Sequence, residues 1–327
     1  MAKTVKNRIQ LIIAVSIFTG ITLSLIQIFT PKPIILLERF GRGWGWIEIG
    51  LLMMYGAFAA MKMSDPKNIS KWRVRFWLLF SIVFFLQLIF GISGIKECLM
   101  TGKLHFPIPA MIIAGPVYRA ETSIMTIIFI SSILLTGPAW CSQLCYFGAI
   151  DAVFANGKTN KRPLKNKSAI KYSILALVIV VALIYNFLGI KGWIPSLSIL
   201  ALGIIGLLVI IWLSRKNRKM IHCTLYCPIG TVVNHLKFIS PFRLVINDSC
   251  TSCLVCTKSC KYDALTKSDI TNLKPGITCT LCGDCISSCH NSSLQYRFGK
   301  LKHDKAHFLY LFITISLHVI FISLARI

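Results

Sequence analysis

The chain has 327 residues, of which 55% are apolar and only 14% are charged, and its mean hydropathy is +0.70. These values exclude a soluble globular fold and indicate a polytopic membrane protein. Lysine and arginine outnumber aspartate and glutamate by 36 to 11. In a membrane protein this excess is typical of basic loops kept on the cytoplasmic side, and no nucleic-acid-binding motif accompanies it.

Seven apolar segments predict seven membrane-spanning helices. The first is uncharged, lacks a small-residue cleavage site and is interpreted as a retained anchor. The stretch 96–121 contains Pro107, Pro109 and Pro116, which break a helix, so it is expected to form an interfacial or re-entrant loop. The predicted spans are residues 9–29, 44–61, 76–95, 122–140, 172–190, 193–214 and 306–325.

Seven spans divide the loops between two sides of the membrane. The side that holds the N-terminus carries 28 of the 36 lysines and arginines. The positive-inside rule therefore predicts a cytosolic N-terminus and an outward C-terminus in a bacterial cytoplasmic membrane. The same orientation places twelve of the thirteen cysteines in the reducing cytosol, where thiolates can bind metal.

Eight of these cysteines form two copies of the pattern C-x2-C-x2-C-x3-C, which is the pattern of bacterial two-cluster ferredoxins. In that pattern three cysteines hold one [4Fe–4S] cluster, and the fourth binds the cluster of the other copy. Paired zinc sites and a disulfide framework are the alternatives, but their cysteines are spaced differently. Lys261 and His290 follow the fourth cysteines, where proline is usual. The predicted ligand sets are Cys250, Cys253, Cys256 and Cys289 for one cluster, and Cys279, Cys282, Cys285 and Cys260 for the other.

A second constellation is a pair of C-x3-C motifs, each just beyond the cytosolic end of a span. Their similar surroundings indicate an internal repeat. Residues four apart share one face of a helix, so each pair presents two thiols in one direction. Four converging thiolates suit a further iron–sulfur site. A copper site and redox-active thiols are the functional alternatives, and four buried cysteines with a purely structural role are the alternative without chemistry. The four cysteines are Cys141, Cys145, Cys223 and Cys227, here called the quartet.

With these motifs the chain resembles the NapH/NosR-type membrane polyferredoxins between about residues 122 and 295. The resemblance implies electron transfer between the quinol pool or cytosolic donors and periplasmic redox proteins. Two features depart from the family pattern: Tyr146 follows Cys145 where proline is expected, and a seventh span follows the ferredoxin motif.

The expected architecture is an all-α membrane protein with an inserted α+β ferredoxin module. Its predicted domains are residues 1–240 with six spans, 241–300 with the two clusters, and 301–327 with the last helix. The expected function is electron transfer to or from redox partner proteins or quinol, and catalytic residues are not assigned. A copper or quinone reductase that uses the quartet, or a redox-sensing regulator, is the alternative.

Weaker candidates lie elsewhere in the chain. His318 lies inside the last span and is expected simply to hydrogen-bond a neighbouring helix, although it has no obvious partner. A transmembrane haem is disfavoured because no second span interior supplies a facing histidine. The outward loop carries residues that could line a quinol or partner site, although ordinary interfacial polar residues explain them better. These loop residues are Glu97, Cys98, His105, Tyr118 and Arg119.

Overall fold

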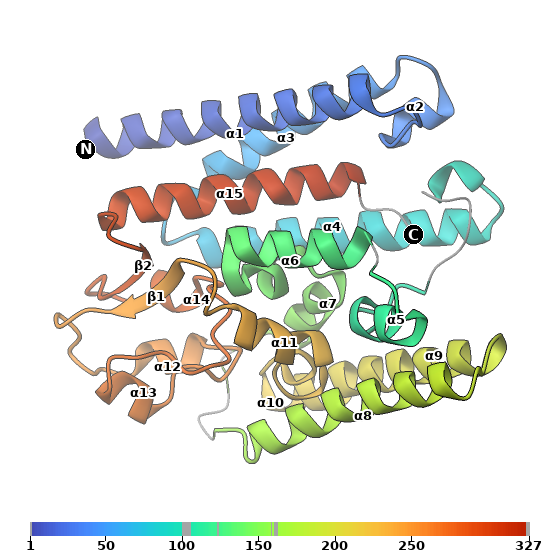
Figure 1. Ribbon diagram of the computed structural model, residues 1–327. Helices are drawn as coiled ribbons and strands as arrows, with labels where there is room; N and C mark the ends of the chain where they lie inside the picture. The colour runs from blue at the N-terminus through green and yellow to red at the C-terminus, as the bar shows by residue number, and fades with distance from the viewer. Residues whose placement is uncertain (1, 100–105, 123, 158, 160–162, 325–327) are drawn as a thin grey trace. The chain divides into compact units, whose positions relative to one another are not determined.

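The computed structural model describes residues 2–99, 106–122, 124–157, 159 and 163–324 (Figure 1). Among them, seven helices are long and apolar enough to cross a membrane, which confirms the prediction of seven spans and a multi-pass protein. These helices are Lys6–Phe29, Gly45–Met63, Ile69–Ile92, Met125–Leu144, Lys167–Phe187, Trp193–Asn217 and His303–Leu324.

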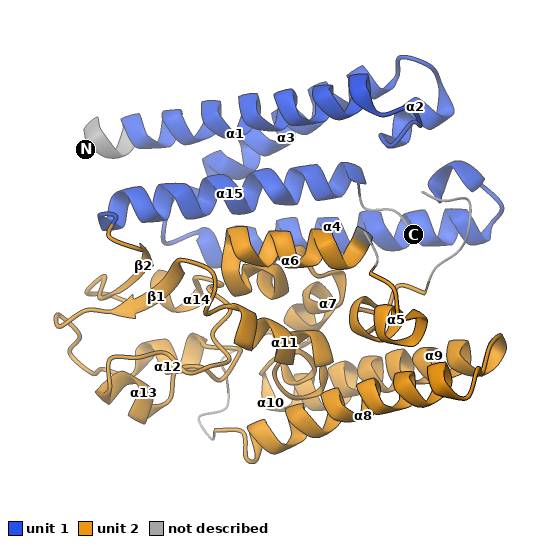
Figure 2. Ribbon diagram, viewed as in Figure 1, with its two compact units in different colours: residues 1–105, 301–327 blue, residues 106–300 orange. Residues whose placement is uncertain are grey.

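The chain forms two compact units, shown in different colours in Figure 2. Residues 1–105 and 301–327 form unit 1, and residues 106–300 form unit 2. The spans between residues 106 and 240 thus pack with the Cys-rich segment, defined here as residues 241–300. The C-terminal helix packs with the first three spans.

Unit 1 is a bundle of α1 (Ala2–Phe29), α3 (Gly45–Met63), α4 (Ile69–Ile92) and α15 (His303–Leu324), with the short α2 (Leu36–Phe40) and a 3-10 turn (Lys96–Cys98) at its loops. Gly56 of α3 lets three helices approach closely. A Cβ atom there would lie 3.2 Å from Val15 of α1 and 3.4 Å from Val319 of α15. Such small residues are typical of packed membrane helices, where backbone proximity replaces hydrophobic burial as the driving force.

Helix α4 begins at Ile69, well before the predicted start of its span at residue 76. The basic side chains of this first part are accommodated by aromatic rings. Arg73 is buried with its guanidinium 5.3 Å from the centre of the Trp77 ring, and Arg75 lies 4.7 Å from that of Trp72. Cation–π contact and the apolar stems of these residues allow a basic segment to continue the helix.

Unit 2 holds the other spans and the Cys-rich segment. Its first half contains α5 (Met111–Arg119), α6 (Ile124–Thr136), a 3-10 turn (Gly137–Ala139), a π-helical turn (Trp140–Leu144), α7 (Tyr146–Phe154), α8 (Lys167–Phe187) and α9 (Trp193–Leu208). A second π-helical segment (Val209–Ser214), α10 (Arg215–Asn217), a third π turn (His222–Tyr226) and α11 (Pro228–Leu236) follow.

Helix α5 corrects the expectation that prolines exclude a helix from residues 96–121. Pro116 lies inside α5 and cannot donate the usual hydrogen bond to the carbonyl of Ile112. The hydroxyl of Thr126, on α6, donates to that carbonyl instead, at 3.4 Å. A partner on another helix therefore offsets the lost hydrogen bond. The low helix propensity of proline does not predict such a contact, because the contact depends on tertiary packing.

The Cys-rich segment begins and ends with an antiparallel strand pair, β1 (Phe242–Ile246) and β2 (Leu294–Phe298), in which Phe242 pairs with Phe298 and Ile246 with Leu294. Alternate residues of β1 are buried, as expected for a strand with one covered face. Between the strands lie α12 (Val255–Ser259), α13 (Lys267–Thr271) and α14 (Asp284–Ser287). Thr266 begins α13 with a capping box closed by Asp269.

Candidate metal centres

Two cavities in the Cys-rich segment are each lined by four cysteines. The first cavity is lined by Cys250, Cys253, Cys256 and Cys289. The second is lined by Cys260, Cys279, Cys282 and Cys285. Each set combines three cysteines of one motif copy with the last cysteine of the other, so the structure brings together the same groups that the motif spacing predicts as ligand sets.

Two short helices produce this interleaving. Helix α12 carries Cys256 of the first cavity and ends at its C-cap, Cys260, which belongs to the second. Helix α14 carries Cys285 of the second cavity and leads to Cys289 of the first. Four residues separate the two cysteines in each case, so each short helix displaces the second cysteine along its axis, where it reaches the other cavity.

The two motif copies also share an unusual backbone. The second and fourth residues after the first cysteine have positive φ angles in both copies: 53° at Ser252 and 59° at Leu254, 57° at Leu281 and 85° at Gly283. Residues that alternate between right- and left-handed conformations turn successive N–H groups inward and form an anion-binding concavity, which is common at iron–sulfur sites. Leucine adopts such angles only under constraint from its surroundings.

The buried thiols of both cavities are protonated when no metal is bound. Burial raises the pKa of Cys256 to about 11 and that of Cys260 to about 12, with neighbouring cysteines adding to the shift. The backbone N–H of Ala264 donates to the sulfur of Cys260 at 3.2 Å, and this hydrogen bond lowers the pKa of Cys260. Without a cation these thiols hold their protons, and a bound metal group would displace them, because only the thiolate is a ligand.

The donor set fits an iron–sulfur cluster better than one ion. A single zinc with bonds of about 2.3 Å would draw four sulfurs to within about 4 Å of one another. Among the residues that the structure describes, no group of three or more His, Cys, Asp or Glu side chains is spaced to hold one ion. Four cysteines placed around a cavity suit the larger cube.

The quartet cysteines lie in two segments with the same backbone. Cys141 lies in the π turn Trp140–Leu144 and Cys223 in the π turn His222–Tyr226. Each turn closes with a hydrogen bond five residues long, Cys145 N–H to Trp140 O at 3.1 Å and Cys227 N–H to His222 O at 2.8 Å. The sequence-based expectation of two thiols on one face of an α-helix was therefore wrong in geometry, because the helix widens at each motif and ends at its second cysteine.

Cys145 and Cys227 then serve as the N-caps of α7 and α11, and both have extended backbone angles. Burial raises the pKa of Cys145 to about 12, whereas the backbone amides of Gly148 and Phe147 lower it. The amides of Gly230 and Ile229 act in the same way on Cys227. Both thiols therefore face the positive end of a helix, which favours a thiolate once a metal is present.

The four quartet thiols are near enough to influence one another. The pKa of Cys223 is raised by burial, then by the carboxylate of Asp151 and by the other three quartet cysteines. Gly230 permits this approach, because a Cβ atom there would lie only 2.7 Å from the carbonyl oxygen of Cys223. The structure thus brings the two C-x3-C motifs together within unit 2.

Asp151 is a residue of this centre that sequence reasoning missed. It is buried on α7, its carboxylate accepts from the backbone N–H of Cys223 at 3.0 Å, and burial raises its pKa to about 6. The available signal was a single carboxylate within the apolar stretch Tyr146–Phe154, directly after the first C-x3-C motif.

Hydrogen bonds join the second cavity to the quartet. Ser142, which follows Cys141, donates its hydroxyl to the carbonyl of Thr280, which follows Cys279, at 3.0 Å. Tyr262 donates to the carbonyl of Cys141 at 3.3 Å. Ser142, Tyr262 and Thr280 are all buried, so these contacts form a dry connection between the Cys-rich segment and the quartet.

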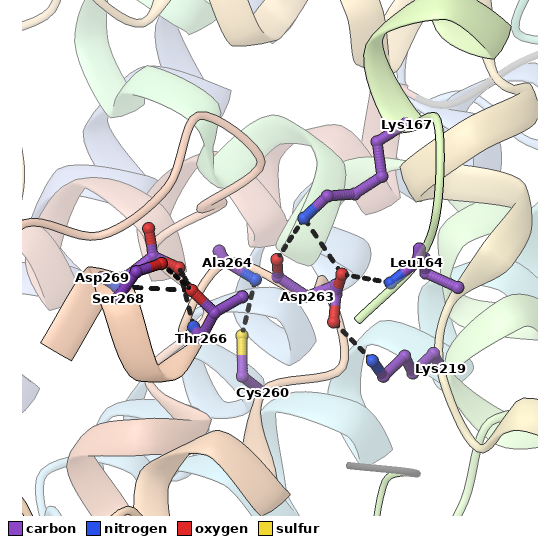
Figure 3. Close-up of polar contacts among 9 residues, drawn as sticks. All are labelled: Leu164, Lys167, Lys219, Cys260, Asp263, Ala264, Thr266, Ser268 and Asp269. Carbon is purple, nitrogen blue, oxygen red and sulfur yellow. Dashed lines mark hydrogen bonds and ion pairs between the residues drawn. The ribbon is translucent and has the colours of Figure 1, made fainter. Parts of the chain in front are cut away.

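A buried ion cluster, shown in Figure 3, fastens the Cys-rich segment to the first half of unit 2. The carboxylate of Asp263 pairs with Lys219, and its other oxygen lies 3.0 Å from Lys167 and accepts from the N–H of Leu164 at 2.9 Å. Burial would raise the pKa of Asp263, but the hydrogen bonds from Lys219, Leu164 and Lys167 outweigh it and hold the pKa below its usual range.

The candidate residues of the outward loop belong to different units of the chain. Glu97 and Cys98 belong to unit 1, whereas Tyr118 and Arg119 belong to unit 2, and His105 lies outside the described residues. The hydroxyl of Tyr118 donates to the carbonyl of Ile190 at 2.9 Å, which is a structural contact.

His318 contacts a neighbouring helix through a hydrogen bond, as expected, although the sequence did not identify its partner. Its Nε2 atom lies 2.9 Å from the hydroxyl of Tyr55 on α3, in hydrogen-bonding geometry.

Comparisons with known proteins bear on the quartet. Residues 120–163 and 199–240 match a family described as a 4Fe-4S binding domain. Each matched segment holds one C-x3-C motif, so one family description covers both halves of the quartet. This agrees with the internal repeat and with the shared backbone of the two π turns.

Two relatives share more of the chain. The chain is 25% identical to the "Putative electron transport protein YccM" of Escherichia coli (strain K12) over 245 residues, which cover 67% of this chain and 64% of the relative. The chain is 23% identical to the "Uncharacterized protein MJ0750" of Methanocaldococcus jannaschii over 213 residues, which cover 60% of this chain and 87% of the relative. The match thus spans less than two thirds of the length of YccM. No solved structure matches the chain.

Proposed function

We propose that the chain is a multi-pass membrane electron-transfer protein that holds two [4Fe–4S] clusters in a ferredoxin module, residues 241–300, and a further iron–sulfur cluster at the quartet. The observation that carries this proposal is the pair of cavities, each lined by four cysteines drawn from both motif copies. The name of the Escherichia coli relative, which refers to electron transport, supports the same function.

In the module, Cys250, Cys253, Cys256 and Cys289 would hold one cluster, and Cys260, Cys279, Cys282 and Cys285 the other. A bound cluster supplies one-electron transfer. The left-handed residues of each motif loop favour N–H groups that turn inward, where they would stabilise the charge of a bound cluster. Buried side chains such as Leu244 and Leu281 line the second cavity and exclude water from it.

At the quartet, Cys141, Cys145, Cys223 and Cys227 would hold the further cluster. The family match of both C-x3-C segments to a 4Fe-4S binding domain favours iron over copper here. The helix N-termini at Cys145 and Cys227 stabilise thiolate charge, and Asp151 positions the backbone of Cys223.

The orientation and partners follow from the charge distribution and the resemblance. We infer that the N-terminus and the ferredoxin module lie in the cytosol and that the last helix ends outside a bacterial cytoplasmic membrane. Redox proteins on either side, or quinol in the membrane, would exchange electrons with the chain, as the resemblance to NapH/NosR-type proteins implies.

Spectroscopy of anaerobically purified protein tests this function. The wild-type protein is expected to show electron paramagnetic resonance signals from the module and a separate signal from the quartet. Cys141→Ala and Cys223→Ala should each remove the same quartet signal and leave the module signals intact. Loss of different signals in the two variants, or copper bound in place of iron, would contradict a shared iron–sulfur site.

A further inference from the structure

The two cavities of the Cys-rich segment differ in their access to solvent. In the second cavity Cys260, Cys282 and Cys285 are buried, and hydrogen bonds from Ser142 and Tyr262 tie this side to the quartet segment. In the first cavity Cys253 is exposed. A soluble protein can therefore approach the first cavity, whereas the quartet segment covers one side of the second.

Polar residues form the rim of the first cavity. Thr251, His290 and Asn291 line it and are exposed. The amide of Asn291 donates to the hydroxyl of Thr251 at 3.3 Å and links the loops of the two motif copies across the rim. Such a rim offers hydrogen-bonding groups beside the cavity.

The exposed charge of the segment is almost entirely positive. Three of its four carboxylates are used internally: Asp263 in the buried ion cluster, Asp269 in the capping box of α13, and Asp284 in a buried position. Asp248 is its one exposed acidic residue. The exposed basic residues are Lys258, Lys267, Lys274, Arg297 and Lys300.

Two of these lysines lie on the short helices that contribute lining residues to the first cavity. Lys258 lies on α12, two residues after Cys256, and Lys267 begins α13, whose Ile270 also lines the cavity. From these positions we propose that the face around Cys253, Lys258 and Lys267 is the docking surface for a small acidic electron-transfer protein. This inference rests on the proposed function. It adds the surface, the sign of the partner's charge and the cavity that the partner approaches.

Binding of a probe protein tests the docking surface. The full chain in nanodiscs of neutral phosphatidylcholine is titrated with an acidic plant-type ferredoxin at low ionic strength, and the dissociation constant is measured by interferometry. Lys258→Glu combined with Lys267→Glu should weaken binding at least about tenfold, because two positive charges that attract the acidic ferredoxin become negative charges that repel it. The matched control is Arg297→Glu combined with Lys300→Glu, the same change in net charge at the other end of β2, and it should weaken binding less than threefold.

Further outcomes decide the proposal independently of cluster chemistry. Binding of the ferredoxin should weaken as salt is raised from about 0.01 to 0.15 M, because the Debye length shrinks from about 30 to 8 Å. A basic cytochrome c, used as the charge-reversed probe, should not bind. Bound ferredoxin should also protect Cys253 from a bulky thiol reagent in protein prepared without iron.

Equal weakening by the two double variants would overturn the proposal. So would binding of the wild-type face to anionic phosphatidylserine vesicles but not to the ferredoxin, which would assign the lysines to the membrane surface. Neither result depends on whether the cysteines carry iron. A protein that lacks iron but still binds the probe through Lys258 and Lys267 would refute the proposed function and leave the docking surface standing.

Discussion

The buried ion cluster at Asp263 offers a sharp test of how the Cys-rich segment is held. The side chains of Lys219 and Asp263 are only 3% and 6% exposed. Replacement Asp263→Asn removes the negative charge but keeps a residue type that tolerates the left-handed backbone found there, with φ of 51°. Lys219 then loses this carboxylate partner inside the protein, which typically costs about 3–5 kcal/mol.

This cost converts to a measurable shift. For a unit of this size, about 1 kcal/mol lowers the melting temperature by roughly 2–4 °C, so Asp263→Asn should lower it by about 6–20 °C. The assay is thermal unfolding in detergent, with protease cleavage within residues 241–300 as the readout. The control is Lys167→Met: the Lys167 side chain is 27% exposed, and its pair with Asp263 should contribute no more than about 1 kcal/mol.

The pH dependence of this contribution has a defined sign. The pKa of Asp263 is lowered in the folded protein, so the pair stabilises fully above the unfolded pKa of about 3.9 and is lost only as pH falls through the folded value. The difference between wild type and Asp263→Asn should thus not become smaller as pH falls from 8 to 5, and a buried Lys219 that loses its proton in the variant would make the difference smaller only toward higher pH. Equal melting temperatures for Asp263→Asn and Lys167→Met would refute the buried-pair argument.

Three further predictions concern packing, the connection to the quartet, and topology. Gly230→Ala should destabilise unit 2 by about 1–3 kcal/mol and weaken metal retention at the quartet, because the new Cβ atom would lie 2.7 Å from a backbone oxygen. An unchanged melting temperature together with an unchanged metal content would contradict this. Tyr262→Phe should lower the free energy of unfolding by about 1 kcal/mol and shift the quartet's electron paramagnetic resonance signal. The control Tyr296→Phe also loses a buried hydrogen bond to a carbonyl, but one within the Cys-rich segment, so it should lower the free energy of unfolding equally without shifting the signal. Reporter fusions at positions 157 and 191 should report opposite sides of the membrane, and the same side for both would refute the predicted orientation of the loops.

Much of the architecture could be predicted because its causes are local in the sequence. Runs of apolar residues long enough to cross a bilayer predicted all seven spans. The spacing of the eight motif cysteines predicted which four would surround each cavity, since one helical turn carries the fourth cysteine of each copy away from the first three. The near-repeat of the C-x3-C motifs predicted that they form one kind of element, and the two π turns share one geometry.

What the sequence did not reveal depends on partners far along the chain. Pro116 is tolerated in a helix because Thr126 supplies a hydrogen bond from another helix. His318 meets Tyr55, 263 residues away, and Asp151 meets the backbone of Cys223, 72 residues away. No periodicity in a single sequence encodes such pairings, because they depend on how helices pack. A lone carboxylate in an apolar helix is nevertheless a sign that such a partner exists.

The central claim is that three groups of four cysteines hold iron–sulfur clusters. Iron and acid-labile sulfide counted per chain, in anaerobically purified wild-type protein and in Cys141→Ala, test it most directly. The account predicts about twelve irons in the wild type and about eight in the variant, because each cluster contains four irons and the module retains its two. Stoichiometric zinc in place of iron, or the same iron count in both proteins, would contradict it.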